Sequence, residues 1–335
     1  MIVPDPSDRR THYLAEFLGK FGLTDVDLRA QIDDTFGDSK LVVATGSVLQ
    51  GFANATSDID LFVIVDREVQ GLPILSFTGG ARIDITFHTV AAVKQHVDRL
   101  HSAWPAKGPL PQREFVARKR ALDILTRFAL SLPIGGTQSW REWRHDLEAP
   151  WLRDAVVQWW EVDAIRKWEA ARFFASRRPL LGRQRYYEAA LAALERRAAL
   201  AGQIYFVSGT AKWLPEKFAA IGDDEGLRRC LSVLDLSDVG YETTVERLLR
   251  EELGGGTLRT GWQIELTPLE GIESFPIDGR TLVSRWQGRY VEIPGHMEFP
   301  CSDKAFWRGD LGTEPPLPWD ILMEEGMVWM SVVAR

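Results

Sequence analysis

The sequence predicts an α+β protein with a mixed sheet first, a helical bundle second and a small α+β part last. Three observations lead to this prediction. Short β-branched runs alternate with helical patterns as far as about Val93. From Pro111 to Ile221, long stretches repeat apolar residues at intervals of three and four, which is typical of helices. Beyond them, short strand-like runs are separated by turn residues.

This pattern divides the chain into three consecutive domains. The 335 residues are enough for more than one hydrophobic core. The predicted bounds are 1–110 for the mixed-sheet domain, 111–225 for the helical bundle and 226–335 for the C-terminal α+β domain.

The first domain is expected to begin with two helices and to continue with strands. The run LVVAT is β-branched and stops at Gly46, and a polar turn, NATS, precedes the run DIDLFVIVD. PILSFTGG, between later strands, is expected to be a loop. The predicted helices cover 11–23, 25–36 and, briefly, 47–53, and the predicted strands cover 41–45, 58–66 and 81–89.

Proline and glycine separate the helices of the second domain. The predicted helices cover 113–130, 151–178 and 183–206. In the third domain we expect a helix over 237–253 and strands over 260–266, 280–286 and 289–295. The apolar terminus, 319–335, fits either type of element.

Composition excludes several classes of protein. The net charge of −7 argues against a general nucleic-acid binder. Cys230 and Cys301 lack the spacing of a zinc site or a disulfide framework. The N-terminus does not resemble a signal peptide, and there is no apolar run long enough to span a membrane. We therefore expect a cytoplasmic protein without a membrane partner.

Three carboxylates stand inside apolar strands. Side chains alternate along a strand, so Asp58 and Asp60 share one face while Ile59 and Leu61 take the other. Asp84 is a lone acid in the next predicted strand, and it converges on the first two if the strands pair. Hard oxygen ligands in this pattern suit Mg²⁺, and three acids can hold two ions for displacement at phosphorus.

A Gly-Ser turn stands just before these acids. Gly46 and Ser47 end one strand and open a short helix, which presents backbone N–H groups and a hydroxyl to an anion. The string T-G-S, ten residues and then D-I-D-L resembles the signature of the nucleotidyltransferase superfamily that includes DNA polymerase β. The later Ile83-Asp84-Ile85 matches that family's third acid. Thr45 is a mild departure, because a hydrophobic residue is usual before the glycine.

The resemblance implies a role for each residue of the signature. Ser47, next to Gly46, would contact the triphosphate of ATP or of another nucleoside triphosphate. Asp58 and Asp60 would bind two Mg²⁺ ions. Asp84 would bind the catalytic ion and help to deprotonate the acceptor. The simpler interpretation, an acidic strand edge facing water, requires three acids and the Gly-Ser turn to coincide by chance.

A second patch lies in the segment VSGTAKWLPEKF, at 207–218. It is most similar to an element of aminoglycoside and other small-molecule adenylyltransferases, whose helical domain reaches the triphosphate across the nucleotide cleft. The resemblance implies phosphate contacts from Ser208 and Lys212, and less strongly from Lys217. The alternative is a surface lysine at a helix end. His88 falls on the same strand face as Asp84, where a structural role is the more common one.

The reaction implied is transfer of a nucleoside monophosphate, AMP in the first place, to an acceptor hydroxyl. A small-molecule acceptor is expected, and the acidic chain suits a cationic one. A protein acceptor, a second nucleotide as acceptor, RNA extension and a nucleotide-binding module without chemistry remain alternatives. Retention of all three acids argues against the last of these.

Overall fold

The structure is a computed structural model and describes residues 6–54, 56–66, 74–78, 80–102, 110–206, 213–235, 240–254, 261–285, 289–294 and 306–334. The chain forms two compact units, each made of separate segments. Unit 1 contains Met1–Ser102, Arg118–Val156 and Gly202–Lys217. Unit 2 contains Ala103–Ala117, Val157–Ala201 and Phe218–Arg335.

Unit 1 opens with two helices, α1 (Pro6–Gly19) and α2 (Asp25–Phe36). A capping box starts α2. The Thr24 hydroxyl accepts from the Asp27 N–H at 3.2 Å, and the Asp27 carboxylate accepts from the Thr24 N–H at 2.8 Å. These bonds satisfy backbone donors that a helix start leaves without partners. The second predicted helix, 25–36, is therefore confirmed to the residue.

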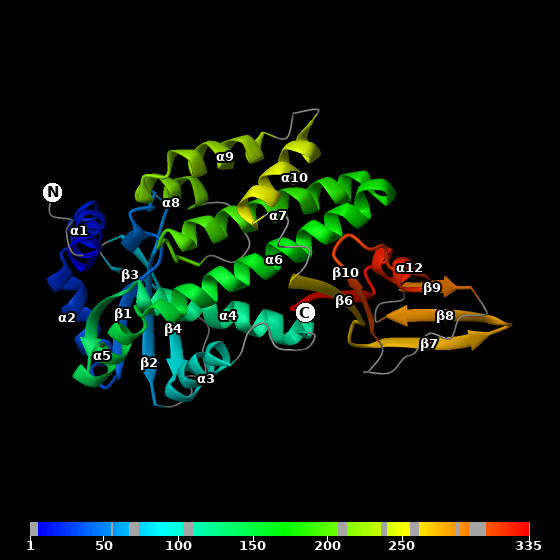
Figure 1. Ribbon diagram of the computed structural model, residues 1–335. Helices are drawn as coiled ribbons and strands as arrows, with labels where there is room; N and C mark the ends of the chain where they lie inside the picture. The colour runs from blue at the N-terminus through cyan, green and yellow to red at the C-terminus, as the bar shows by residue number, and fades with distance from the viewer. Residues whose placement is uncertain are drawn as a thin grey trace. The chain divides into compact units, whose positions relative to one another are not determined.

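A five-stranded mixed sheet forms the centre of unit 1 (Figure 1), in the order β3-β4-β2-β1-β5. β2 and β4 are parallel, and the other neighbouring pairs are antiparallel. A short 3₁₀ helix, η1 (Val48–Gln50), follows β1. The strands are β1 (Leu41–Thr45), β2 (Ile59–Val65), β3 (Ile74–Thr78), β4 (Ala81–Thr89) and β5 (Leu132–Gly136).

The two faces of this sheet differ in chemistry. Ile59, Leu61 and Ile83 point to one face, where they join a buried cluster with α1 and α2 (Figure 1). Asp60 and Asp84 alternate with these residues and therefore point to the opposite face. This packing confirms that Ile59 and Leu61 take the face opposite Asp60, whose own face also carries the buried Phe62 and Ile64.

Two strands of the sheet were not predicted. β3 lies in the segment PILSFTGG, which we expected to be a loop, and β5 lies between two predicted helices. β5 pairs antiparallel with β1 at the edge of the sheet, with a register shift between Val42 and Val43. An edge strand tolerates Pro133, because its free side needs no N–H donor. Proline and glycine there predicted a break, and the partner strand that outweighs it is distant in sequence.

Helices make up most of the rest of the chain up to residue 252 (Figure 1). α7 ends at Leu200, six residues before the predicted end, and Gly202 follows with φ +96°. α9 was not predicted. The helices are α3 (Val90–His101), α4 (Gln112–Ala129), α5 (Gln138–Asp146), α6 (Pro150–Arg177), α7 (Pro179–Leu200), α8 (Leu214–Ile221), α9 (Asp224–Leu234) and α10 (Tyr241–Glu252).

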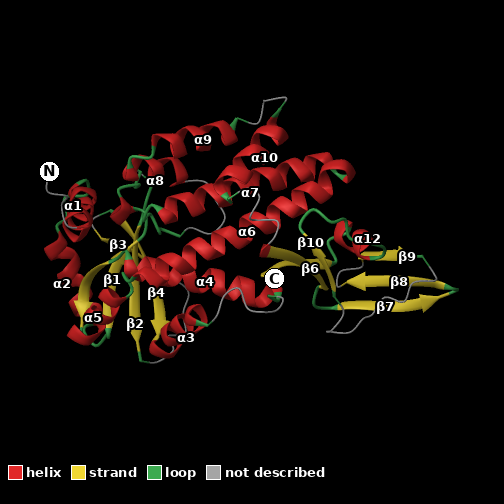
Figure 2. Ribbon diagram, in the orientation of Figure 1, coloured by secondary structure: helices red, strands yellow, loops and turns green. Residues whose placement is uncertain are grey.

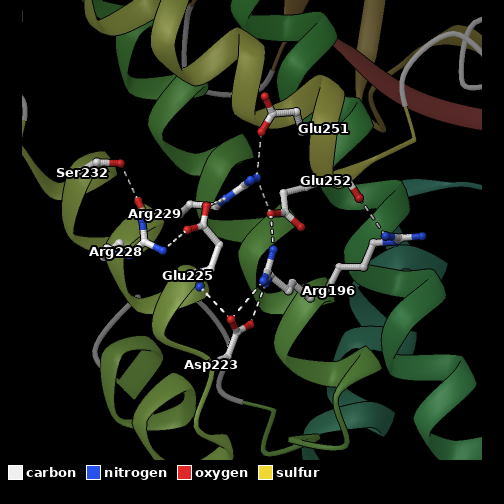
Figure 3. Close-up of polar contacts among 10 residues, drawn as sticks. Arg196, Asp223, Glu225, Arg228, Arg229, Ser232, Glu251 and Glu252 are labelled. Carbon is white, nitrogen blue, oxygen red and sulfur yellow. Dashed lines mark hydrogen bonds and ion pairs between the residues drawn. The ribbon is translucent and has the colours of Figure 1, made fainter.

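An ion-pair network joins α7, α9 and α10 within unit 2 (Figure 3). Asp223 caps α9 by accepting from the Gly226 N–H at 2.9 Å, and it also accepts from Arg197 Nε of α7 at 2.6 Å. Glu252 of α10 accepts from Arg197 at 3.0 Å and from Arg229 at 2.8 Å. Hydrogen bonding to Arg197 holds the pKa of Asp223 below its ordinary value. Networks of this kind stabilise more than isolated surface pairs do.

The C-terminal part of unit 2 contains two three-stranded antiparallel sheets (Figure 2). Phe173 and Phe174 of α6 pack into their shared apolar cluster with α12. The ambiguous terminus forms both types of element, α12 and then β11. One sheet has the order β10-β6-β11 and the other β7-β8-β9, with bounds β6 (Trp262–Pro268), β7 (Ile272–Ile277), β8 (Arg280–Arg285), β9 (Arg289–Ile293), β10 (Trp307–Asp310), α12 (Trp319–Glu324) and β11 (Val328–Ala334).

The predicted α+β class, with a mixed sheet first, helices next and antiparallel sheets near the C-terminus, is confirmed. The division at 110 and 225 stays a prediction. Within the described part of the chain, none of the helices combines the length and the apolar character that a membrane span requires.

Candidate active site

Two of the predicted acids lie side by side in the sheet. β2 and β4 run parallel, and their register pairs Asp60 with Asp84. Residues paired across neighbouring strands point to the same face. Asp60 is largely buried, with 21% of its side chain exposed. The strand pairing on which the sequence hypothesis depended is therefore present.

Asp58 precedes β2 by one residue, after a tight turn. Asn54 Oδ1 accepts from the Thr56 N–H at 3.0 Å, and the Ser57 hydroxyl accepts from the Asn54 N–H at 2.9 Å. This Asx turn fixes the chain just before the strand. Asp58 is partly exposed, and its negative charge acts on Asp60. The structure thus places Asp58 next to the pair formed by Asp60 and Asp84.

Gly46 brings the backbone directly against Asp60. Its φ is +89°, and a Cβ built on it would lie 1.9 Å from Asp60 Oδ2. Only glycine fits both the conformation and the space. Ser47 follows at the start of η1, partly exposed, and its hydroxyl makes no capping hydrogen bond. The Gly-Ser turn therefore adjoins the acids, and the contact of Ser47 with a triphosphate stays a prediction.

Arg127 is a site residue that the sequence did not reveal. It projects from α4, with Nη1 3.5 Å from Asp60 Oδ2 and Nε 3.1 Å from Asp123 Oδ1. Thr45 at the end of β1 donates its hydroxyl hydrogen to the Arg127 carbonyl at 2.9 Å. The spacing of Asp123 and Arg127 is visible in the sequence, but it indicates an ordinary helix ion pair. That α4 covers the acidic face of the sheet is a tertiary fact.

Burial and the nearby charges change the pKa of Asp60. Burial raises the pKa of Asp60 to about 6, against the opposing effect of Arg127, and the charges of Asp58, Asp84 and Asp123 add to the rise. Three carboxylates therefore act on Asp60 together with one guanidinium. A divalent cation would relieve this repulsion directly.

An aromatic cluster flanks the Gly-Ser turn. Phe52, just after η1, packs against Tyr205 and Trp213, with ring centroids 6.1 and 5.9 Å away. Burial raises the pKa of Tyr205 to about 12. The charge of Arg127 opposes this rise, and the charge of Asp60 adds to it. Tyr205 is thus electrostatically coupled to the acids, although the sequence predicted it inside a helix.

In the second predicted patch, Ser208 and Lys212 lie between Tyr205 and Trp213 in the sequence. Ser208 and Lys212 themselves lie outside the described residues, so their phosphate contacts stay predictions. Lys217 is described and is buried, with Nζ 6.0 Å from the Tyr205 ring centroid. Lys217 therefore places a compact cation near Tyr205.

His88 lies further along the acidic face and belongs to the core. It is 8% exposed and packs against Phe62 and Phe128, with ring centroids 4.6 and 5.5 Å away. Burial lowers its pKa to about 4, and the charges of His96, Arg120 and Arg127 add to this effect. The structural role that we judged more common for this residue fits these contacts.

The stability of the protein should consequently depend on pH through His88. With a folded pKa of about 4 against an ordinary value of 6.5, the imidazole stays neutral in the folded protein while the unfolded chain becomes protonated. Its stabilising effect is complete above about pH 6.5 and is lost as the pH falls toward 4. The loss is about 3.5 kcal/mol at most, since one pKa unit corresponds to ~1.4 kcal/mol.

Urea unfolding between pH 4.5 and 7.5 measures this dependence. His88→Leu should remove part of the decline in the free energy of unfolding toward low pH, because leucine has no proton to bind. His145→Leu is the matched control at an exposed histidine. An unchanged pH slope in His88→Leu would contradict the expected protonation.

The oxygen donors at this site suit a hard divalent cation. Asp84 Oδ1 is buried and has no hydrogen-bond partner among the described residues, and the missing Cβ of Gly46 leaves space at Asp60. In the described segments, there is no group of three His, Cys, Asp or Glu side chains that lie close enough together to hold a metal ion. Mg²⁺ needs only one or two carboxylates when phosphates and water complete its shell. Asp60 and Asp84 fit that arrangement, and the two-ion set with Asp58 stays a prediction.

The chain is similar to a protein family and to solved structures. A family of unknown function (DUF6001) matches residues 2–124. No curated protein matches the chain. Among solved structures, the chain is similar to a nucleotidyltransferase-like protein from Exiguobacterium sibiricum 255-15, at 15% identity and a TM-score of 0.32, over 68% of this chain and 77% of that chain. The family match includes Gly46, Asp60 and Asp84 and ends before Arg127.

Proposed function

We propose that the protein is a Mg²⁺-dependent nucleotidyltransferase that transfers AMP from ATP to a hydroxyl group of a small molecule. The observation that carries the proposal is the pairing of Asp60 with Asp84 in parallel strands, directly beside a Gly-Ser turn. The sequence signature names these residues, and the fold brings them to one face of one sheet. A surface strand edge would not require Gly46 to be pressed against a buried carboxylate.

In the proposed reaction, the acceptor oxygen forms a bond to the α-phosphorus of ATP. The bond from that phosphorus to the bridging oxygen breaks, and pyrophosphate leaves. When bound, Mg²⁺ would supply charge neutralisation at the phosphates. Asp60 and Asp84 would hold it, with Asp58 as the third carboxylate. Asp84 Oδ1, which has no partner among the described residues, would accept the proton of the acceptor hydroxyl.

The Gly-Ser turn and the second patch have supporting roles in this proposal. The backbone at Gly46 and the hydroxyl of Ser47 would receive the triphosphate, and glycine allows the close approach that a phosphate needs. Lys212 and Ser208, in the second patch, would also contact the phosphates. Positioning and electrostatic stabilisation would supply most of the rate enhancement.

One observation favours a second candidate, a nucleotide-binding module without chemistry. Arg127 already gives Asp60 a positive partner at 3.5 Å, so a cation is not strictly required to keep this carboxylate in place. In such a module Arg127 would substitute permanently for the metal ion. Mg²⁺-dependent turnover separates the two candidates.

A labelled-nucleotide assay tests the proposal. The protein is incubated with Mg²⁺ and each of the four nucleoside triphosphates, alone and with candidate acceptors that include amino sugars. Pyrophosphate release with ATP and an amino sugar is the expected result, since an acidic protein attracts a cationic acceptor. Product without an added acceptor would instead favour a second-messenger synthase or self-modification.

Two further outcomes contradict the proposal. Nucleotide binding without release of pyrophosphate under any acceptor would favour the module. The absence of binding of every nucleotide, with and without Mg²⁺, would exclude both candidates. Omission of Mg²⁺ with excess chelator is the matched control, and it should stop turnover.

A further inference from the structure

Unit 2 contains a cavity of about 220 Å³, and its lining residues do not include the three acids of the sheet. Residues of α6, α7 and β11 line it. Pockets that bind drug-sized ligands usually measure ~300–1,000 Å³. This cavity therefore suits a molecule built around a single ring.

Three cationic side chains line the cavity, namely Arg166, Lys167 and Arg185. Arg166 and Lys167 share one carboxylate, Asp163, with N–O distances of 2.8 and 2.5 Å. Arg185 pairs with Glu188 at 2.6 Å. Three cations against two carboxylates leave a positive excess at the wall of the cavity, which favours an anionic ligand.

Asp163 fixes two of these cations. It is 2% exposed, and although burial alone would raise its pKa, Lys167 and Arg166 hold that pKa below the ordinary value. It is therefore ionised at neutral pH and keeps both cations in place.

The rest of the wall is apolar and aromatic. Trp329, Phe174 and Met330 line it. Trp329 is rigidly held, because its indole N–H donates to the Leu110 carbonyl at 2.9 Å and the Arg166 guanidinium lies 4.6 Å from its ring centroid. A rigid aromatic wall suits a flat ligand and costs little entropy on binding.

We propose that this cavity binds a small organic anion, a ring that carries a carboxylate or phosphate group. The anionic group would face Arg166, Lys167 and Arg185, and the ring would pack on Trp329 and Phe174. This site is independent of nucleotidyl transfer, and its ligand does not have to be the acceptor.

Calorimetric titration of the full chain tests the site. The probes are benzoate and phenyl phosphate, with benzyl alcohol and benzylamine as neutral and cationic controls of similar size. At least one anion should bind, more than tenfold tighter than benzyl alcohol, and benzylamine should bind least. The anion that binds more tightly identifies the preferred head group.

Arg185→Gln is the informative variant, because Arg185 is partly exposed and does not pair with the buried Asp163. It should weaken anion binding about tenfold and leave the affinity for benzyl alcohol unchanged. Arg228→Gln is the matched control, on an exposed arginine of α9 outside the cavity. Binding should also change the tryptophan fluorescence, and Trp329→Phe should abolish most of that change.

Three results would overturn the proposal. They are the failure of both anions to bind, an affinity for the tighter-binding anion that is no higher than the affinity for benzyl alcohol, and an Arg185→Gln protein that binds the anions as tightly as the wild type does. Far-ultraviolet circular dichroism of each variant confirms that the comparison is made on folded protein.

Discussion

Replacing Asp60 by asparagine should reduce Mg²⁺-dependent pyrophosphate release about a thousandfold or more. Asparagine keeps the size of the side chain but removes the negative charge that would hold the metal and phosphates. Charge stabilisation by a metal contributes several kcal/mol, and each ~1.4 kcal/mol is a tenfold change in rate. The measurement is pyrophosphate release from ATP with the best acceptor found, at saturating Mg²⁺.

The fold should survive this substitution. Asp60 is strained by burial and by its acidic neighbours, as its raised pKa of about 6 shows, so a neutral side chain of the same shape is tolerated there. Asp66→Asn is the matched control, because Asp66 follows the same strand, is exposed and pairs with Lys40 at 2.9 Å. Near-wild-type turnover by a folded Asp60→Asn protein would rule out the proposed role of this carboxylate.

Gly46→Ala should damage both stability and activity. At φ +89° an alanine is strained by ~1–3 kcal/mol. Its Cβ would also meet Asp60 Oδ2 at 1.9 Å, so the carboxylate must move. A misplacement of about 1 Å can reduce a rate a hundredfold. Denaturant unfolding measures the first effect, and pyrophosphate release measures the second.

Gly202→Ala separates the two causes. Gly202 also has a positive φ, +96°, but a Cβ there would meet no atom within 4 Å. It should therefore lose stability through backbone strain and keep its activity. If Gly46→Ala and Gly202→Ala lose equal stability and both remain active, the close approach of Gly46 to Asp60 is not required for activity.

The sequence predicted the strands that carry the acids better than it predicted the outer strands of the same sheet. β1, β2 and β4 are visible because each is a continuous run rich in apolar and β-branched residues, and β2 and β4 each contain a lone acid. β3 and β5 are not, because both lie in segments rich in proline and glycine, where local chemistry indicates a turn. Pairing with β1, which is distant in sequence, decided the structure of β5, whereas β3 pairs with the adjacent β4.

The same limit applies to the candidate site. Gly46 and the acids form a spaced signature, so the sequence could name them and the register of β2 and β4 could bring Asp60 beside Asp84. Arg127 and Tyr205 come from far along the chain and match no motif. Their proximity to Asp60 depends on how α4 and the segment after α7 fold onto the sheet, which is a property of tertiary packing.

The contribution of β5 to the sheet has a consequence for how the molecule can be divided. A polypeptide ending at residue 110 would contain Gly46 and all three acids, and yet it would not be an autonomous fragment. Without β5, the β1 backbone would become an open, apolar edge, and such edges promote self-association. It would also lack Arg127, leaving the charge of Asp60 without its partner. The smallest self-sufficient piece around the acids must therefore extend well past residue 136.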